Sequence, residues 1–350
     1  MFAQNRDSLF TRNHLTPVRW VLALSVMLGH AYFTATGFEP IRVHSWSASY
    51  LAVNGFFILS GLLIAKSLNL GKSKSRFATA RLLRIIPGLL LILFSYFLFF
   101  GPLFTAGYGQ TVHDGDFITY TLRVLFLGDP ESTPGTIFSE NKLQAFNGSL
   151  WTIRFEIIAY FLTAALIWLR LVRGPVTAAL LFIALTLADL VAPAFTQSAG
   201  VNSGLRLMSA FSLGLLLWYT PELRRPGWLY TGLLLVLFLA FGWTPVGEVL
   251  ANLALAALIL KFGLPIQPLK YADKLPDYSY GIYLWHYPIM QAVLVYVPGI
   301  QPIQLFLVAM PFTLLVSMIS WSFIERPALK LKEWKIPFSR PQWVRESDAK

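Results

Sequence analysis

Long apolar stretches, separated by shorter polar segments, recur along the whole chain. Each is about 17 to 22 residues long, which is enough for an α-helix to cross the ~30 Å hydrocarbon core of a bilayer. The pattern therefore predicts an all-α polytopic membrane protein, a bundle of about ten transmembrane helices. We place these spans at about residues 16–36, 47–67, 82–104, 151–170, 176–193, 204–220, 228–243, 246–262, 278–298 and 304–324.

One segment between the predicted spans is much longer than the others. Residues 105–150 are rich in Gly, Asn, Ser and Thr and contain a short apolar piece at 117–128. Because a piece of that length cannot cross a bilayer, we expect it to be re-entrant or interfacial and to cap the outer face. The chain divides into one transmembrane domain, residues 1–325, and a basic cytoplasmic tail, residues 326–350. We expect this tail to lie on the anionic lipid of the inner leaflet.

Composition and charge agree with a membrane protein. The chain has 350 residues, of which 56% are hydrophobic and 13% charged. Most of its 28 Lys and Arg residues fall in alternate connecting segments, which predicts that both termini are cytoplasmic. The net charge of +11 is explained by this asymmetry and does not call for a nucleic-acid partner.

Several chemistries are excluded or disfavoured by residue type. The chain has no cysteine, so it has no thiolate nucleophile, disulfide or cysteine metal site. Its five histidines are scattered without metal-ligand spacing, so we expect no metal. It also lacks a hydrolase G-x-S-x-G elbow and a Walker loop.

The first predicted span carries two residues that are costly in a bilayer, Arg19 and His30. Their spacing is close to three helical turns, so both project from one helix face about 16 Å apart. Arg19 lies at the membrane edge and His30 near mid-depth. An ionisable residue at that depth is a functional candidate by default.

Other spans carry candidates with two interpretations each. Arg81 and Arg84 are spaced i, i+3 and so lie on one helix face. They are either membrane anchors or, together with Arg19, a clamp for a phosphate-rich cytosolic donor. Glu156 is either a structural ion-pair partner, for Arg154 or another helix, or an acid/base group beside a histidine.

The last two spans are similarly ambiguous. His286, among several tyrosines and tryptophans, is either a histidine satisfied by a tyrosine or part of a pocket. Glu325 forms either an exposed pair with Arg326 or a functional contact. Asp189 and Arg206 also lie inside spans, and the pattern assigns them no role.

Taken together, these stretches resemble the acyltransferase-3 family of integral membrane acyltransferases over almost the whole chain. The family's signature of Arg, ten residues and His falls on Arg19 and His30. Its other motifs fall, in order, on Gly55, Phe56, Phe57, Ser60 and Gly61; on Arg81 and Arg84; on Ser149, Leu150, Trp151 and Glu156, with Ile157 where relatives often have a second acid; on Tyr278, Ser279, His286 and Pro288; and on Glu325 and Pro327. From packing alone, Gly55 and Gly61 would allow close helix approach.

The resemblance implies an O-acyltransferase of a bacterial inner membrane. Such an enzyme moves an acyl group, with acetyl favoured, from cytosolic acyl-coenzyme A to a hydroxyl of an extracytoplasmic polysaccharide, O-antigen or glycolipid. Many relatives carry an additional SGNH domain, and this chain resembles the stand-alone members. The bundle then either transfers the group directly or relies on a polysaccharide-assembly partner.

The resemblance also suggests roles for the candidates. Arg19, Arg81, Arg84 and Glu325 would bind the donor. His30 would act as general base or as a transient acyl carrier, with the base favoured, and Glu156 and His286 would orient it or assist proton transfer. Asn147, Trp151, Tyr283 and Trp285 would form the acceptor pocket. The alternative from another class is a proton-coupled transporter or flippase that uses the same buried charges.

Overall fold

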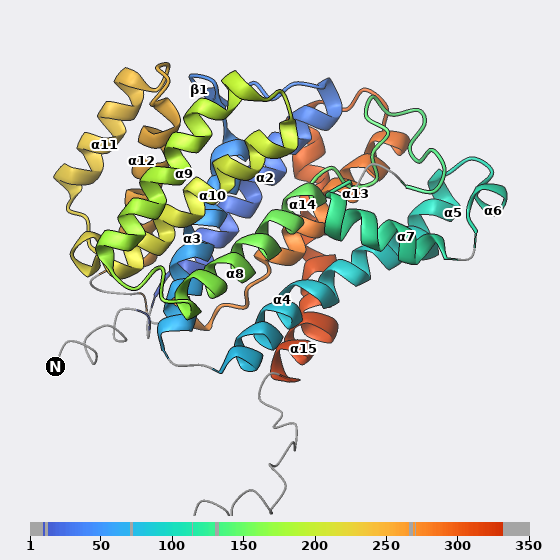
Figure 1. Cartoon of the computed structure of the whole chain (residues 1–350). Helices are drawn as coiled ribbons and strands as arrows, with labels where there is room; N and C mark the ends of the chain where they lie inside the picture. The colour runs from blue at the N-terminus through green and yellow to red at the C-terminus, as the bar shows by residue number, and fades with distance from the viewer. Residues whose placement is uncertain are drawn as a thin grey trace, which may run out of the picture.

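Helices make up nearly all of the computed structural model (Figure 1). It describes residues 10, 13–70, 73–113, 115–129, 133–265, 269 and 271–331. The predicted tail at 326–350 lies outside this part beyond residue 331. The sole paired strands among the described residues are β1 (Arg42–Val43) and β2 (Trp46–Ser47), a short antiparallel hairpin with His44 in its turn at a φ of 55°.

Each predicted span coincides with a helix. They are α2 (Leu15–Thr36), α3 (Ala48–Asn69), α4 (Lys74–Ser95), α8 (Ile153–Trp168), α9 (Pro175–Phe195), α10 (Ala199–Tyr219), α11 (Trp228–Phe241), α12 (Gly247–Gly263), α13 (Ser279–Tyr296) and α14 (Pro302–Ser320). A π-helical turn at Tyr96–Phe100 joins α4 to α5 (Gly101–Phe104), and another at Trp321–Glu325 joins α14 to α15 (Arg326–Lys330).

Seven helices in the described part are long and apolar enough to cross a membrane. They are Leu15–Thr36, Ala48–Asn69, Lys74–Phe104, Leu150–Trp168, Pro175–Phe195, Ala199–Tyr219 and Pro302–Lys330. The helices α11 and α12 are shorter, with 14 and 17 residues, and α13 is less apolar because of its tyrosines, His286 and Gln291. The multi-pass prediction is confirmed.

One boundary differs clearly from the prediction. The helix expected from residue 82 begins at Lys74, because the Ser73 side chain caps it by accepting a hydrogen bond from the Arg76 N–H at 3.3 Å. This first part is basic and polar, so an apolarity pattern cannot detect it.

The long outer segment is partly helical. It contains α6 (Tyr108–Thr111), α7 (Asp116–Leu122), a π-helical turn at Arg123–Leu127 and a 3₁₀ turn at Leu150–Thr152. The apolar piece at 117–128 thus forms a short helix, which lies against α4 and α8 (Figure 1).

Two close helix contacts position the site. Gly61 of α3 and Gly214 of α10 face each other, because a Cβ on either would overlap the carbonyl oxygen of Phe211 or Ile58. The predicted packing role of Gly61 is therefore confirmed. On the other side, α13 packs between α2 and α14.

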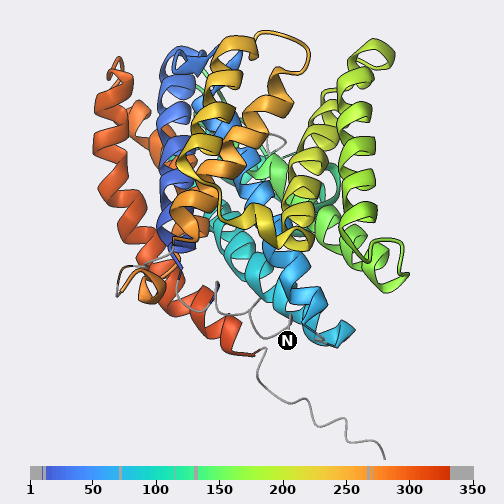
Figure 2. The ribbon, with the colours of Figure 1, turned by 90° about the vertical axis from the view of Figure 1, so that its left-hand side faces the viewer.

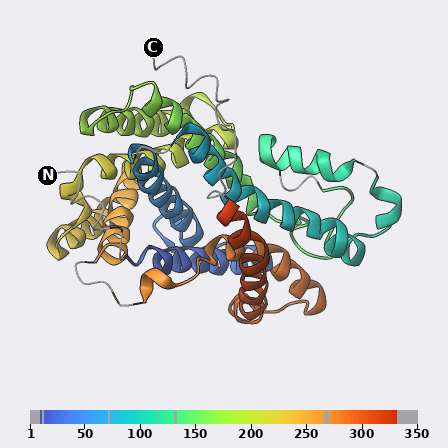
Figure 3. The same ribbon diagram turned by 90° about the horizontal axis from the view of Figure 1, so that it is seen from below.

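The described chain begins and ends at one side of the bundle. Figure 2 shows the first residues of α2 and the last of α15 at its lower end. Seen from that end, α4 and α15 lie beside each other (Figure 3). An even number of membrane crossings places both ends of a chain on the same side of the membrane. We call this the inner end, following the predicted orientation.

Candidate active site

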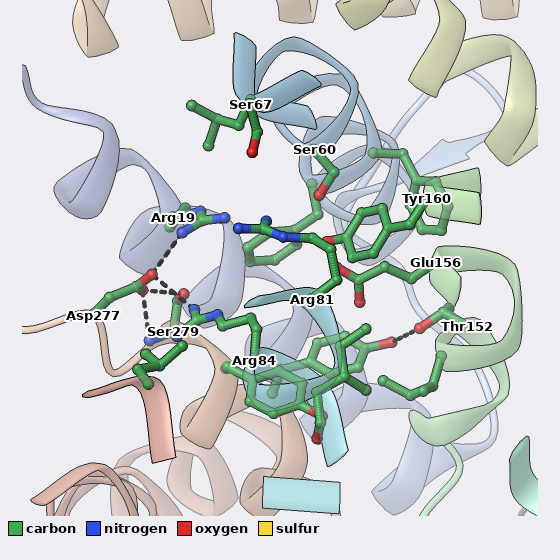
Figure 4. Close-up of a pocket in the computed structure, with 18 of the residues that line it drawn as sticks. Arg19, Ser60, Ser67, Arg81, Arg84, Thr152, Glu156, Tyr160, Asp277 and Ser279 are labelled. Atoms are coloured by element: carbon green, nitrogen blue, oxygen red, sulfur yellow. Dashed lines mark hydrogen bonds and ion pairs between the residues drawn. The ribbon is translucent and has the colours of Figure 1, made fainter. Parts of the chain in front are cut away.

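A deep cavity of ≈ 440 Å³ opens at the inner end of the bundle. Figure 4 shows side chains that line it. Along α3 it is lined from Leu70, at the inner end, to Val53, near the outer end. At 1.5 Å per residue that separation is about 25 Å, most of the membrane thickness. Its polar lining includes Arg19, Ser60, Lys66, Ser67, Arg81, Arg84, Thr152, Glu156, Tyr160, Asp277 and Ser279.

Asp277 holds two of the three arginines that were predicted to bind a donor. Its Oδ2 accepts hydrogen bonds from Arg19 Nη1 at 2.6 Å and from Arg84 Nη2 at 2.8 Å. Its Oδ1 accepts from the hydroxyl of Ser279 at 2.5 Å and from the Ser279 N–H at 3.3 Å, at the beginning of α13. The carboxylate therefore fixes both guanidiniums relative to α13.

The charge on Asp277 is strongly stabilised. Burial raises the pKa of its carboxyl, but the guanidiniums of Arg84 and Arg19 and the hydrogen bonds from Ser279 outweigh burial. They hold the pKa well below its ordinary value of 3.8, so the group is ionised throughout the physiological range.

Arg81 differs from its two neighbours. It forms no ion pair with any described residue, and its Nε has no hydrogen-bond partner there. Its Cζ lies 5.9 Å from the ring centre of Tyr160. A half-buried guanidinium that lines a cavity and has no ion-pair partner there is suited to binding an anion.

Glu156 lies in this same cavity, beside Arg81 and Tyr160 (Figure 4). It accepts a hydrogen bond from the Tyr160 hydroxyl. The expected position beside a histidine is not found among the described contacts, because Glu156 lines the inner cavity whereas His30 lines the outer one. Arg154 is not its partner either, and donates instead to the carbonyl of Leu127.

Glu325 is buried behind Arg84. Its Oε2 lies 4.0 Å from Arg84 Nη1, and its Oε1 accepts from the Ser320 hydroxyl at 2.9 Å. In the described part its charged partner is thus Arg84 rather than Arg326. It supports the arginine from outside the cavity lining.

His30 and His286 face each other across α2 and α13. Their rings are stacked, with 2.8 Å between His30 Nδ1 and His286 Nε2. His286 Nδ1 lies 2.9 Å from the carbonyl of Ile282, which can only accept, so this nitrogen carries the proton. His286 Nε2 is then the acceptor, and His30 Nδ1 must donate to it. We assign His30 the tautomer that leaves Nε2 unprotonated, as a general base requires.

A second cavity, of ≈ 310 Å³, opens at the outer end and contains His30. The hairpin between α2 and α3 supplies part of its wall. Its polar and aromatic lining includes His30, Phe33, Glu39, Arg42, Ser47, Ser49, Tyr50, Trp151, Arg206 and Tyr283. Val53 and Tyr283 line both cavities, so the two meet at these side chains.

Comparison with known proteins identifies the family. An acyltransferase domain model matches residues 15–322. The chain belongs to the acyltransferase-3 family. It is 26% identical to an O-acetyl transferase of Shigella phage Sf6, an alignment that covers 90% of this chain and 95% of that protein. No solved structure matches it.

Two further relatives extend the comparison. This acyltransferase is 27% identical to nodulation protein 10 of Rhizobium leguminosarum bv. viciae, with 95% of this chain and 97% of the relative covered. It is 28% identical to acyltransferase MdmB of Streptomyces mycarofaciens, with 79% and 78% covered. The resemblance read from the motifs is therefore confirmed.

The four residues predicted for the acceptor pocket of this acyltransferase divide into two pairs. Trp151 and Tyr283 line the outer cavity. Asn147 is buried and donates to the carbonyl of Leu284 at 2.7 Å, which makes it an anchor for α13. Trp285 is also buried, outside the described lining of either cavity.

Tyr283 is fixed at the junction of the two cavities. Its hydroxyl donates to the carbonyl of Ser149 at 2.7 Å, so the Thr152 hydroxyl, also 2.7 Å away, must be the donor in their contact. Its ring is 6.1 Å from that of His286. Tyr283 is thus held in one position where the inner and outer cavities meet.

Two site residues of this acyltransferase were missed or left without a role. Asp277 stands just before a predicted span in a segment that also holds lysines, and an acid there is the signal that was overlooked. Arg206 was noted as costly, but nothing in the sequence places it in the outer cavity with His30.

Proposed function

We propose that this protein moves an acyl group, with acetyl favoured, from cytosolic acyl-coenzyme A to a hydroxyl of an extracytoplasmic carbohydrate. The observation that carries the proposal is the pair of cavities. The inner one holds a cluster of arginines, the outer one holds His30, and they meet at Val53 and Tyr283. A carbohydrate outside and a thioester donor inside would approach one another at that junction.

The inner cavity suits the donor in charge and shape. Arg81, without an ion pair in the described part, would bind a phosphate first, and Arg19 and Arg84 are held nearby by Asp277. The depth of about 25 Å along α3 suits the long pantetheine arm, with the acyl group at the far end. Phe56 and Phe57 supply apolar walls along the way.

Catalysis would use the unprotonated Nε2 of His30. This nitrogen takes the proton of the acceptor hydroxyl while the oxygen attacks the thioester carbonyl carbon. The carbon–sulfur bond breaks, the electron pair leaves on sulfur, and the imidazolium returns the proton to the thiolate. The products are an ester and free coenzyme A thiol, with no net gain or loss of protons.

His286 would act as a positioning residue in this scheme. Its bond to His30 Nδ1 fixes both the ring orientation and the tautomer. The alternative in which His30 carries the acyl group uses the same free nitrogen. It would leave an acyl-imidazole when donor is supplied without acceptor.

The relatives support the acyl group and the acceptor only through their names. The phage protein is an O-acetyl transferase, which favours acetyl and an oxygen acceptor here. We further propose a bacterial inner-membrane location, a glycan or glycolipid acceptor, and cooperation with polysaccharide-assembly proteins.

The test is thiol release from acetyl-coenzyme A by the protein in nanodiscs, with a crude polysaccharide extract as acceptor. We expect His30→Ala and Arg84→Ala to lose about 10² to 10⁴ in rate while still folding. His113→Ala and Arg173→Ala, which change exposed residues outside both cavities, are the matched controls.

Two outcomes separate the rival interpretations. Folded wild type that releases no thiol above background with a panel of donors and acceptors would favour the transporter, with His30 on a proton path. An acetylated His30 peptide, found by mass spectrometry after exposure to donor alone, would favour the acyl carrier over the base.

A further inference from the structure

Arg206 has a place in the outer cavity that the mechanism so far leaves unused. It lies in α10, is only 6% exposed, and lines the same cavity as His30. Its Cζ is 3.7 Å from the ring centre of Tyr50 and 5.8 Å from that of Trp151. The guanidinium is therefore held between aromatic side chains that belong to the cavity wall.

The described residues satisfy only part of the hydrogen-bonding capacity of Arg206. Its Nε and Nη1 have no hydrogen-bond partner in the described part. Arginine stays charged in proteins, and burying its donors without partners is costly. Such donors, more than nine-tenths buried and facing a cavity, point to a ligand that completes them.

The charge of Arg206, by contrast, has a counterpart nearby. Glu248 of α12 lies behind Tyr50 and accepts hydrogen bonds from the Tyr50 hydroxyl at 3.0 Å and from Asn54 Nδ2 at 3.2 Å. Asn54 also donates to Asn252 at 2.9 Å. Both Glu248 and Asp189 interact electrostatically with the guanidinium, although neither forms an ion pair with it in the described part. The missing partner is therefore a hydrogen-bond acceptor rather than a further negative charge.

Glu39 is the carboxylate in the described lining of the cavity, and it already has hydrogen-bond partners. Both oxygens of Glu39 accept from Ser49, at 2.9 Å from the N–H and 2.5 Å from the hydroxyl. It therefore has little capacity to bind an acceptor. Of the charged groups lining this cavity, Arg206 is the buried one with free donors.

We propose that Arg206 binds the acceptor sugar, donating hydrogen bonds to neutral oxygens close to the hydroxyl that His30 deprotonates. The apolar face of the sugar ring packs on Trp151, because an aromatic ring in a cavity gains by covering such a face. The acceptor is accordingly a neutral pyranoside unit rather than a uronic acid. This inference rests on the proposed function, since it names the acceptor class of that same site.

The test measures binding separately from catalysis. Wild type in nanodiscs is titrated with neutral methyl glycosides of glucose, galactose and mannose, and with methyl glucuronoside, by tryptophan fluorescence. Coenzyme A binding is measured in parallel on the same samples. We expect neutral glycosides to bind to wild type. Arg206→Leu should weaken their binding about tenfold to a hundredfold, because the sugar loses its hydrogen bonds from a charged donor.

Two variants define the specificity of the effect. Arg206→Gln keeps amide donors without the charge and is expected to fall between wild type and Arg206→Leu. Arg123→Gln changes another arginine, which is half-exposed and pairs with Asp129 outside the cavity, and should bind sugars normally. Coenzyme A binding should be equal in all four proteins.

Several results would overturn the inference. They are no binding of any neutral glycoside, binding of the glucuronoside alone, or equal sugar binding by wild type and Arg206→Leu. A loss of coenzyme A binding together with sugar binding in Arg206→Leu would assign the residue a structural role instead. Sugar binding without any coenzyme A binding in wild type would contradict the proposed function but not the sugar site.

Discussion

Replacing His286 tests the assignment of the His30 tautomer. In His286→Phe, His30 Nδ1 loses the acceptor that lies 2.8 Å away. Leaving a buried donor unpaired costs about 1 to 3 kcal/mol, and His30 can avoid that cost by moving its proton to Nε2. An imidazole with Nε2 protonated cannot take a proton from the acceptor. We therefore expect acetyl transfer to fall about 10² to 10⁴.

His286→Gln separates positioning from proton transfer. A glutamine side chain has a carbonyl oxygen that accepts from His30 Nδ1 but cannot itself act as acid or base. If His286 only positions His30, the glutamine variant should recover a measurable part of the rate that phenylalanine loses. The donor KM should not change in either variant, because His286 does not line the inner cavity.

The assay is multiple-turnover transfer of labelled acetyl in nanodiscs, with kcat and donor KM determined separately. Equal rates for wild type and His286→Phe would refute the tautomer argument. Equal loss in the phenylalanine and glutamine variants would show that His286 takes part in proton transfer itself.

Three further predictions concern the inner cavity and the helix contacts. Asp277→Asn should lower the free energy of unfolding by about 3 kcal/mol, the low end for a buried ion pair, since the two guanidiniums that lose their partner are only half-buried. Coenzyme A should raise the melting temperature of this variant more than that of wild type, and equal shifts would contradict this. The second prediction concerns pH. Because the pKa of Asp277 is lowered on folding, its carboxylate stabilises the fold fully above about pH 4, and this contribution is lost as the pH falls further. The difference in unfolding free energy between wild type and Asp277→Asn should therefore stay constant from about pH 5 to about pH 8 and become smaller below about pH 4. Gly61→Ala should cost about 1 to 3 kcal/mol in detergent unfolding, whereas Gly232→Ala, at a position with open space, should cost less than about 0.5 kcal/mol.

The helices could be predicted because a bilayer imposes a length and an apolarity on each span. That constraint acts locally, so every predicted span is found as a helix. The prediction fails outside the bilayer, where this constraint does not act. The basic first turns of α4 are an example, because a serine cap fixes where they begin.

The pairing of side chains across helices is not a local property. His30 and His286 each stood out as costly residues, but their contact joins positions 256 residues apart. Asp277 was overlooked because it lies outside the apolar runs, although it holds Arg19 and Arg84 together. Residue type and depth identify candidates, whereas partners depend on the packing of α2, α4 and α13.

Glu156 shows why depth along a span does not determine which cavity a residue faces. It lies about one turn from the outer end of α8, which suggests a place beside His30. The inner cavity nevertheless extends past it to Thr152 and Val53, because the cavity follows α3 from Leu70 to Val53. A residue near the outer surface is therefore reached from inside. The same depth would let a donor bound at the inner arginines bring its acyl group to the acceptor without any large movement of the bundle.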